Sequence, residues 1–241
     1  MNHIKLIKYI IGIAILIGIG FYSMCIFNKN KIINKNYHFN DEIVGHLEIP
    51  GTNINYDIYM YSKYIEKGED IKDNLLFNQD KDAVLTSDNN VRIGKVWGHN
   101  IKNVSSKPQI TNEKHERLEQ LLSFTDYDFS KENQKFYYTK DKEMEFVIFA
   151  AGYIPGYFAH YNLNTTKEET DILINNARLY SKYDYNIEVS NEDKILYITT
   201  CTRAYGSRKD VSYGVFGRMV RKGEKINTVE ITINQDVKEI I

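Results

Sequence analysis

Residues 194–203 read KILYITTCTR, and this stretch decides more about the chain than any other. Apolar and β-branched side chains alternate from Ile195 to Thr200, a pattern that predicts a β-strand. The strand delivers Cys201 at its C-terminal end, where a rigid sheet can present a reactive side chain to a cleft. A lone cysteine is more often a small buried apolar residue, so the rest of the sequence must decide which role Cys201 has.

The composition excludes several classes of protein. The chain holds 31 basic and 32 acidic side chains, and this near balance gives no electrostatic reason to expect a nucleic-acid partner. Cys25 and Cys201 are the two cysteines, and Cys25 falls in an apolar N-terminal segment. A disulfide between them is not expected, the sequence lacks the ligand spacing of a zinc site, and we expect neither a metal nor a cofactor. Cys201 is therefore predicted to be a free thiol.

A nearly uninterrupted apolar run without charge covers residues 9–27 and is long enough for one membrane-spanning helix. A cleaved signal peptide would have a shorter apolar region and a small-residue cleavage motif, which this run lacks, so we favour an anchor over a signal. We expect residues 1–8 in the cytoplasm, residues 9–27 in the membrane and residues 28–241 on the extracellular side. Residues 28–40 are polar and are interpreted as a linker to a folded domain over residues 41–241.

Short apolar stretches bounded by turn residues predict a strand-rich fold for that domain. Strands are expected within residues 43–58 (two strands around a Pro-Gly turn), 83–85, 93–97, 135–139, 145–153, 187–189, 195–200, 213–220 and 229–233. Many short strands with few helices indicate a mainly β domain, either a barrel or a sandwich with helical insertions.

Two helices are predicted among these strands. Leucines at helical spacing indicate a short helix over residues 115–122. A capping box at residues 166–169, followed by one broad apolar face, predicts a longer helix over residues 166–182, inserted between late strands.

Thiol chemistry requires a nearby base or cation, and the chain has six histidines. His99 stands out because it directly follows an apolar strand and has Gly98 beside it, which permits close backbone approach. A single histidine in such a loop is more often a hydrogen-bonded surface residue, so His99 needs support from the wider pattern.

Taken together, these residues resemble the sortases. Sortases carry a TLxTC signature, which residues 197–201 match as YITTC: the final Thr-Cys agrees, Ile198 is a conservative change and Tyr197 departs. The segment Gly98-His99-Asn100 lies far upstream, and a strand ending in Gly217-Arg218-Met219-Val220 lies downstream, in the order found in the family.

The resemblance extends over the whole predicted domain. Residues 48–56, EIPGTNINY, resemble the early strand pair of sortases, and the helix over residues 166–182 is similar to the insertion that marks class B. The similarity covers residues 43–222, and the order and spacing of the motifs make it specific.

The resemblance implies an eight-stranded sortase β-barrel that acts as a transpeptidase on the outer face of a Gram-positive cell membrane. Cys201 would attack the threonine carbonyl of a C-terminal NPxT(N/G)-like sorting signal on a surface protein and form a thioester. An amine of the peptidoglycan precursor or stem peptide would then resolve the thioester. His99 would act as general acid and then as general base, and no metal is required.

An arginine that stabilises the developing oxyanion is the one member of the site that departs from the family pattern. The family position falls on Ser212, so Ser212 is a candidate for substrate contact and the arginine must come from elsewhere. Arg208 shortly before it is the first candidate and Arg203 the second, since a guanidinium stays charged and donates in a fork. Arg218 matches a separate family position and is interpreted as structural.

Thr199 and Thr200 are the remaining candidates for substrate contact. Because side chains alternate along a strand, the two point to opposite faces, and Thr199 shares the face of Cys201. Thr199 is therefore the better candidate of the two.

Two other classes of function stay open. A papain-type cysteine hydrolase ranks lower, because such enzymes place the cysteine before the histidine and at the start of a helix. A non-catalytic relative that binds wall peptides or proteins is the stronger alternative, because Ser212 stands where an arginine is expected.

Overall fold

The structure is a computed structural model that describes residues 39–66, 76–78, 84–156, 158, 166–206 and 210–240. The predicted anchor and most of the linker lie outside these residues, as does Arg208. Within the described ranges, no helix combines the length and apolar character needed to cross a membrane.

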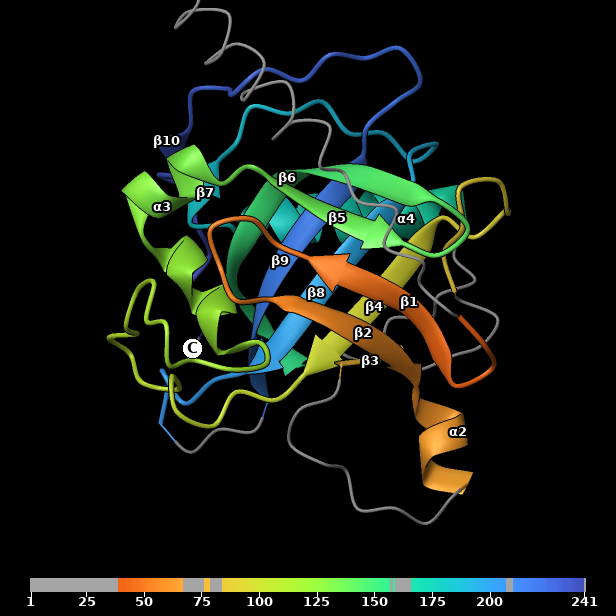
Figure 1. Cartoon of the computed structure of the whole chain (residues 1–241). Coiled ribbons are helices and arrows are strands. Elements are labelled where there is room, and N and C mark those ends of the chain that lie inside the picture. The colour runs from red at the N-terminus through yellow and green to blue at the C-terminus, as the bar shows by residue number, and fades with distance from the viewer. Residues whose placement is uncertain are drawn as a thin grey trace, which may run out of the picture. The chain divides into compact units, whose positions relative to one another are not determined.

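Eight strands of the described residues close into a barrel in the order β1-β2-β3-β4-β8-β9-β6-β5 (Figure 1). The strands are β1 (Ile43–Glu48), β2 (Asn55–Met60), β3 (Leu76–Asn78), β4 (Ile93–Gly98), β5 (Lys135–Thr139), β6 (Glu143–Pro155), β8 (Ile195–Cys201) and β9 (Val211–Met219). Antiparallel pairing of β1 with β5 closes the sheet, which removes its free edges. The eight-stranded barrel implied by the resemblance is confirmed.

Strand β8 lies between β4 and β9 and is buried on both faces (Figure 1). Every residue from Ile195 to Thr200 is buried, and Cys201 alone in the strand is exposed. The apolar residues of the strand all belong to the core, in which the ring of Tyr197 stacks on Phe216 at 5.4 Å and the Tyr197 hydroxyl donates to the Phe158 carbonyl. The strand is thus held rigidly up to the residue that carries the thiol.

The helical segments within the described ranges are α2 (Tyr61–Glu66), the 3₁₀ helix η2 (Glu119–Thr125), α3 (Tyr127–Glu132) and α4 (Lys167–Leu179). The predicted capping box is present at the start of α4, where the Thr166 hydroxyl accepts the Glu169 N–H and the Glu169 carboxylate accepts the Thr166 N–H. The longer helix between late strands is therefore confirmed, although it ends at Leu179 rather than near residue 182. A separate two-stranded sheet pairs β7 (Tyr183–Asp184) with β10 (Thr232–Ile233).

The remaining local predictions need correction. The helix expected over residues 115–122 is a 3₁₀ helix that starts only at Glu119, because Arg117 adopts a φ of 59°, which no right-handed helix tolerates. No strand forms at residues 187–189, where the Ile187 carbonyl accepts from the Arg178 side chain instead of from a neighbouring strand. The strand expected at residues 229–233 is reduced to β10, and Val84 and Leu85 lie in no strand.

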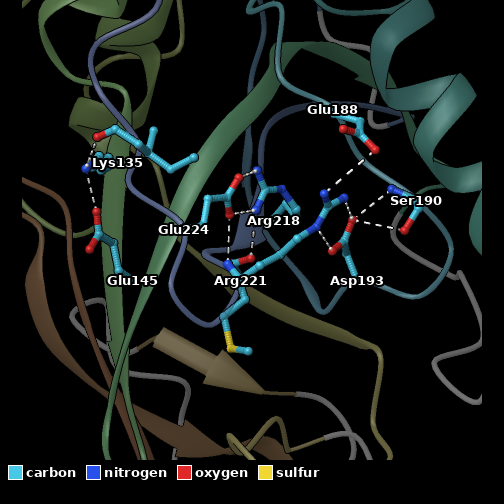
Figure 2. A network of polar contacts seen from close by, with 10 residues as sticks. Lys135, Glu145, Glu188, Ser190, Asp193, Arg218, Arg221 and Glu224 are labelled. Carbon is cyan, nitrogen blue, oxygen red and sulfur yellow. Dashed lines mark hydrogen bonds and ion pairs between the residues drawn. The ribbon is translucent and has the colours of Figure 1, made fainter.

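Two ion pairs lie at the end of the β8–β9 pair that is remote from Cys201 (Figure 2). Arg218 is 1% exposed, and its guanidinium binds both carboxylate oxygens of Glu224 at 2.5 and 2.9 Å. Arg221 binds Asp193 through two further bonds of 2.8 and 2.9 Å. Burial would raise the pKa of Asp193, but the Arg221 side chain and the Ser190 N–H hold it below its usual value. Arg218 therefore has the structural role interpreted from the sequence.

Candidate active site

Strand register brings three of the predicted site residues together. Strand β4 pairs parallel with β8 up to Gly98 opposite Thr200, so the next residues along, His99 and Cys201, are neighbours. Strand β9 pairs antiparallel with β8 and places Ser212 directly opposite Cys201. Residues directly opposite each other on adjacent strands project to the same face of a sheet, so the side chains of Cys201 and Ser212 share one face, and His99 follows the last paired residue of β4 beside them.

The Cys201 thiol is free and exposed at the end of β8. The protein around the thiol partly desolvates it and raises its pKa, and the positive charge of Arg203 opposes that rise. A thiol with a raised pKa carries little thiolate at neutral pH, so it needs a proton acceptor or a cation beside it to become a nucleophile. His99, the first residue after the paired part of β4, is the candidate for the proton acceptor.

The backbone and the ring of His99 both have neighbours that restrict them. The His99 carbonyl accepts the N–H of Leu118 at 3.3 Å, which ties the end of β4 to the start of η2. The imidazole lies edge to face with the Trp97 ring, with centroids 6.4 Å apart and an interplanar angle of 88°. The tryptophan is in turn packed against Tyr61.

The two threonines before Cys201 have different surroundings. The hydroxyl of Thr200 donates to the Gly98 carbonyl at 2.8 Å, so this side chain ties β8 to β4. Thr199 lies on the face of Cys201 and pairs with Gly214, where an added Cβ would be only 2.8 Å from the Ile154 side chain. The contact of either threonine with substrate stays a prediction.

Among the described arginines, Arg203 is the one whose positive charge lowers the pKa of Cys201. It is exposed in the loop after β8, and its backbone N–H donates to the Val104 carbonyl at 2.8 Å. Arg208, the first candidate from the sequence, lies outside the described residues. Ser212 occupies the β9 position opposite Cys201, so the strand itself supplies no arginine there.

Two buried polar residues behind His99 complete the surroundings of the site. Asn100 donates its amide hydrogens to the carbonyls of Cys201 and Asn103 at 3.1 and 3.0 Å. The carboxylate of Glu119 accepts the N–H groups of Ile101 and Lys102, a role that sequence reasoning missed. An acid inside an otherwise leucine-rich segment was the signal available for it.

An aromatic side chain follows Cys201 in the same loop. Tyr205 is 39% exposed and lies edge to face with Tyr153, which packs in the same manner on Tyr213. The ring centroids are 5.5 and 5.1 Å apart. This stack fixes an exposed aromatic surface in the loop that begins at the thiol.

The sequence matches no protein-family model and no curated protein, whereas the fold has clear counterparts. Strand order, the helix inserted before β7 and the solved structures that match define a sortase-type fold in its class B-like form. Three such structures are the Staphylococcus aureus sortase B–substrate complex and the sortases B of Clostridium perfringens and Listeria monocytogenes.

The similarity to these three structures lies in the fold rather than in the sequence. Their TM-scores are 0.59, 0.58 and 0.56, at sequence identities of 15, 17 and 21%. The alignments cover 76, 76 and 74% of this chain and 81, 96 and 95% of the respective relatives. At these identities the comparison establishes the architecture, and the chemistry must be argued from the residues of this chain.

Proposed function

We propose that this protein is a class B-like sortase, a cysteine transpeptidase. It cleaves a C-terminal NPxT(N/G)-like sorting signal after the threonine and transfers the protein to an amine of the peptidoglycan precursor or stem peptide. The observation that carries the proposal is the β4–β8–β9 register: β4 ends opposite Thr200 with His99 as the next residue, and Ser212 pairs with Cys201, whose thiol is exposed. The S. aureus structure of this fold is a sortase B–substrate complex, which supports a substrate of the same class here.

The chemistry follows from a nucleophile and one acid–base group. The Cys201 thiolate attacks the threonine carbonyl carbon, a C–S bond forms, and the C–N bond to the next residue breaks as His99 gives a proton to the departing amine. The acceptor amine then attacks the thioester carbonyl, His99 removes its extra proton, and the C–S bond breaks to release Cys201. Thr199 lies on the same face and is the proposed contact for the substrate backbone.

The oxyanion formed in each step requires a positive or hydrogen-bonding partner. Arg203 is the described residue whose charge already acts on Cys201, and Arg208 remains the alternative. Ser212, opposite Cys201, does not supply this positive charge, and its hydroxyl instead contacts the substrate.

The proposal also places the enzyme at the cell surface. Residues 9–27 would anchor it in the membrane by a single helix, with the barrel on the extracellular side. Surface proteins that carry a sorting signal, together with the peptidoglycan amine, would then meet the site on that side.

One observation favours a second function. Because Ser212 stands where the resemblance leads us to expect an arginine, the barrel would serve as a non-catalytic module that binds wall peptides or proteins if no other arginine completes the site. A binding module would retain peptide affinity but would form no thioester.

The test uses the full-length protein in mild detergent with fluorogenic peptides that contain NPxTN and NPxTG motifs. The wild type is compared with Cys201→Ala, His99→Ala, Arg203→Ala and Arg208→Ala. We expect no cleavage with Cys201→Ala and a rate at least about 10²-fold lower with His99→Ala, because general acid–base catalysis contributes that much. The arginine whose removal has the larger effect is the oxyanion partner.

Mass spectrometry of the protein mixed with each peptide separates the two functions. A covalent adduct at Cys201 that an added amine removes supports the transpeptidase. Binding of the peptide without an adduct supports the binding module. Cleavage that persists in Cys201→Ala would overturn the mechanism.

A further inference from the structure

A buried amide lies directly after His99. Asn100 is 5% exposed, and its amide nitrogen donates to the carbonyls of Cys201 and Asn103. Its side-chain oxygen accepts the Asn103 N–H at 3.0 Å. Two neighbours are carbonyls that only accept and the third is an N–H that only donates, so the orientation of the amide is fixed by its surroundings.

These bonds begin where the sheet stops. The β4–β8 ladder ends at Gly98 and Thr200, one residue before both His99 and Cys201. From that point the Asn100 side chain continues the link between the two strands, because Asn100 is bonded to His99 in the chain and holds the backbone carbonyl of Cys201.

The other side of the His99 loop is held independently. The buried Glu119 carboxylate accepts the N–H groups of Ile101 and Lys102 at 3.3 and 3.0 Å, and the Leu118 N–H binds the His99 carbonyl. With the loop supported from behind by η2, three bonds join it to the end of β8: from the Thr200 hydroxyl to Gly98, from the Arg203 N–H to Val104 and from the Asn100 amide to Cys201. The Asn100 bond is the one that links the residue next to His99 with Cys201 itself.

We propose that Asn100 is a positioning residue for the pair formed by His99 and Cys201. Its amide fixes the separation at which the imidazole can exchange a proton with the thiol, a geometry in which an error of about 1 Å lowers the rate by about 10²-fold. The proposal deepens the function proposed above and depends on it for the cleavage measurement, but the coupling of the two side chains can be measured without any peptide.

The chain offers a closely matched control in Asn103. Asn103 is 3% exposed, donates its amide hydrogens to the carbonyls of Gln109 and Glu119 and accepts the Gln109 N–H. The bonding pattern is the same as that of Asn100, yet its side chain contacts neither His99 nor Cys201. Asn100→Ala and Asn103→Ala therefore remove equivalent buried amides from one loop without changing its charge.

The primary measurement is the rate of Cys201 alkylation by iodoacetamide between pH 5 and 10, on the full-length protein. Wild type, His99→Ala, Asn100→Ala and Asn103→Ala are compared after removal of Cys25 by a Cys25→Ser change in all four. We expect the Asn100→Ala profile to coincide with that of His99→Ala, with at least about a tenfold lower rate near pH 7, since the thiolate then lacks its imidazolium partner. Asn103→Ala should stay within about twofold of wild type.

Peptide cleavage provides the second measurement. Asn100→Ala is expected to lower kcat by about 10²-fold while KM changes by less than about threefold, because the loss lies in the alignment of the reacting groups. If Asn100→Ala does not fold, Asn100→Ser keeps one donor and is compared with Asn103→Ser in the same way.

Three outcomes would overturn the inference. These are an Asn100→Ala profile that equals wild type, equal loss of reactivity in the Asn100 and Asn103 variants, and wild-type and His99→Ala profiles that coincide. Failure of the proposed function is distinguishable, because it appears as wild-type protein that couples its histidine to its thiol but cleaves no peptide.

Discussion

The two ends of the β8–β9 pair are built on opposite principles. At one end Arg218, opposite Ile195, is buried and bound to Glu224, and Arg221 is bound to Asp193 (Figure 2). At the other end the thiol of Cys201 is exposed, and neutral amides and hydroxyls hold the backbone around it. We call these the closed end and the open end.

The difference separates stability from reactivity. At the closed end the buried Arg218 and Asp193 each face an opposite charge on a more exposed residue, Glu224 and Arg221, so the local field is cancelled and the contacts hold the barrel together. At the open end amides and hydroxyls fix the geometry without fixing the charge state of the thiol. The pKa of the thiol then depends on its partial desolvation and on the charge of Arg203.

The largest effect on stability is expected at the closed end. Arg218→Met removes a guanidinium with a side-chain exposure of 2% and leaves Glu224 with the Arg221 N–H but without its charged partner in the pair, which should lower the free energy of unfolding by about 3 kcal/mol. Urea unfolding measures the loss. Alkylation of Cys201 in the folded protein should not change, because the two ends are separated by the length of β8.

The double variant Arg218→Met, Glu224→Gln serves as its control. It removes both charges and should recover most of the lost free energy, since a hydrophobic replacement of a buried pair is often neutral. Equal destabilisation of the single and double variants would contradict the view that the pairing of charges closes this end.

Lys95 tests the region between the two ends. It is buried in β4 with its amine over the Tyr197 ring, 6.0 Å from the centroid, and burial lowers its pKa to about 8. Below pH 8 both folded and unfolded chains carry the charge, so its desolvation destabilises the fold in full. As the pH rises from 8 towards the ordinary lysine value, the folded state loses the proton first and stability increases.

The measurement compares wild type with Lys95→Met by urea unfolding at pH 7 and pH 10. Relative to the variant, wild type should gain about 3 kcal/mol over this interval, at about 1.4 kcal/mol for each unit of pKa shift. Subtraction of the variant removes the contribution of tyrosines that titrate at high pH. If the free energies of unfolding of wild type and Lys95→Met changed by the same amount between pH 7 and pH 10, the Lys95 amine would not be desolvated.

The sequence predicted those parts of the molecule that depend on local pattern. Alternating residues predicted β8, and the capping box at Thr166 predicted the start of α4. The late start of η2 was not predictable, because it depends on a left-handed residue at Arg117 that no composition rule requires.

The candidate site likewise has residues that the sequence pattern predicts and residues whose role depends on tertiary pairing. Cys201 and His99 are predicted from motif order, whereas the role proposed for Asn100 depends on the parallel pairing of β4 with β8, two strands about a hundred residues apart. Hydrogen bonds across such a separation have no local signature. The arginine was not resolved because the expected position holds Ser212, and the choice between the candidates depends on loop geometry.

The smallest effect is expected at the open end, from Arg203→Gln. Removal of the charge should raise the pKa of Cys201 further, because Arg203 opposes the rise caused by desolvation. The alkylation rate near pH 7 should fall by about twofold at low salt and by less at high salt, since exposed charges are screened. The free energy of unfolding should change by no more than about 0.5 kcal/mol.

Peptide cleavage by the same variant then decides what Arg203 does. If cleavage falls about twofold, in step with alkylation, Arg203 acts only through the charge of the thiol, and Arg208 becomes the oxyanion partner. If cleavage falls about 10²-fold or more while alkylation barely changes, the guanidinium stabilises the transition state itself. A variant that unfolds more easily but alkylates normally would reverse the comparison, because the open end would then contribute stability rather than reactivity.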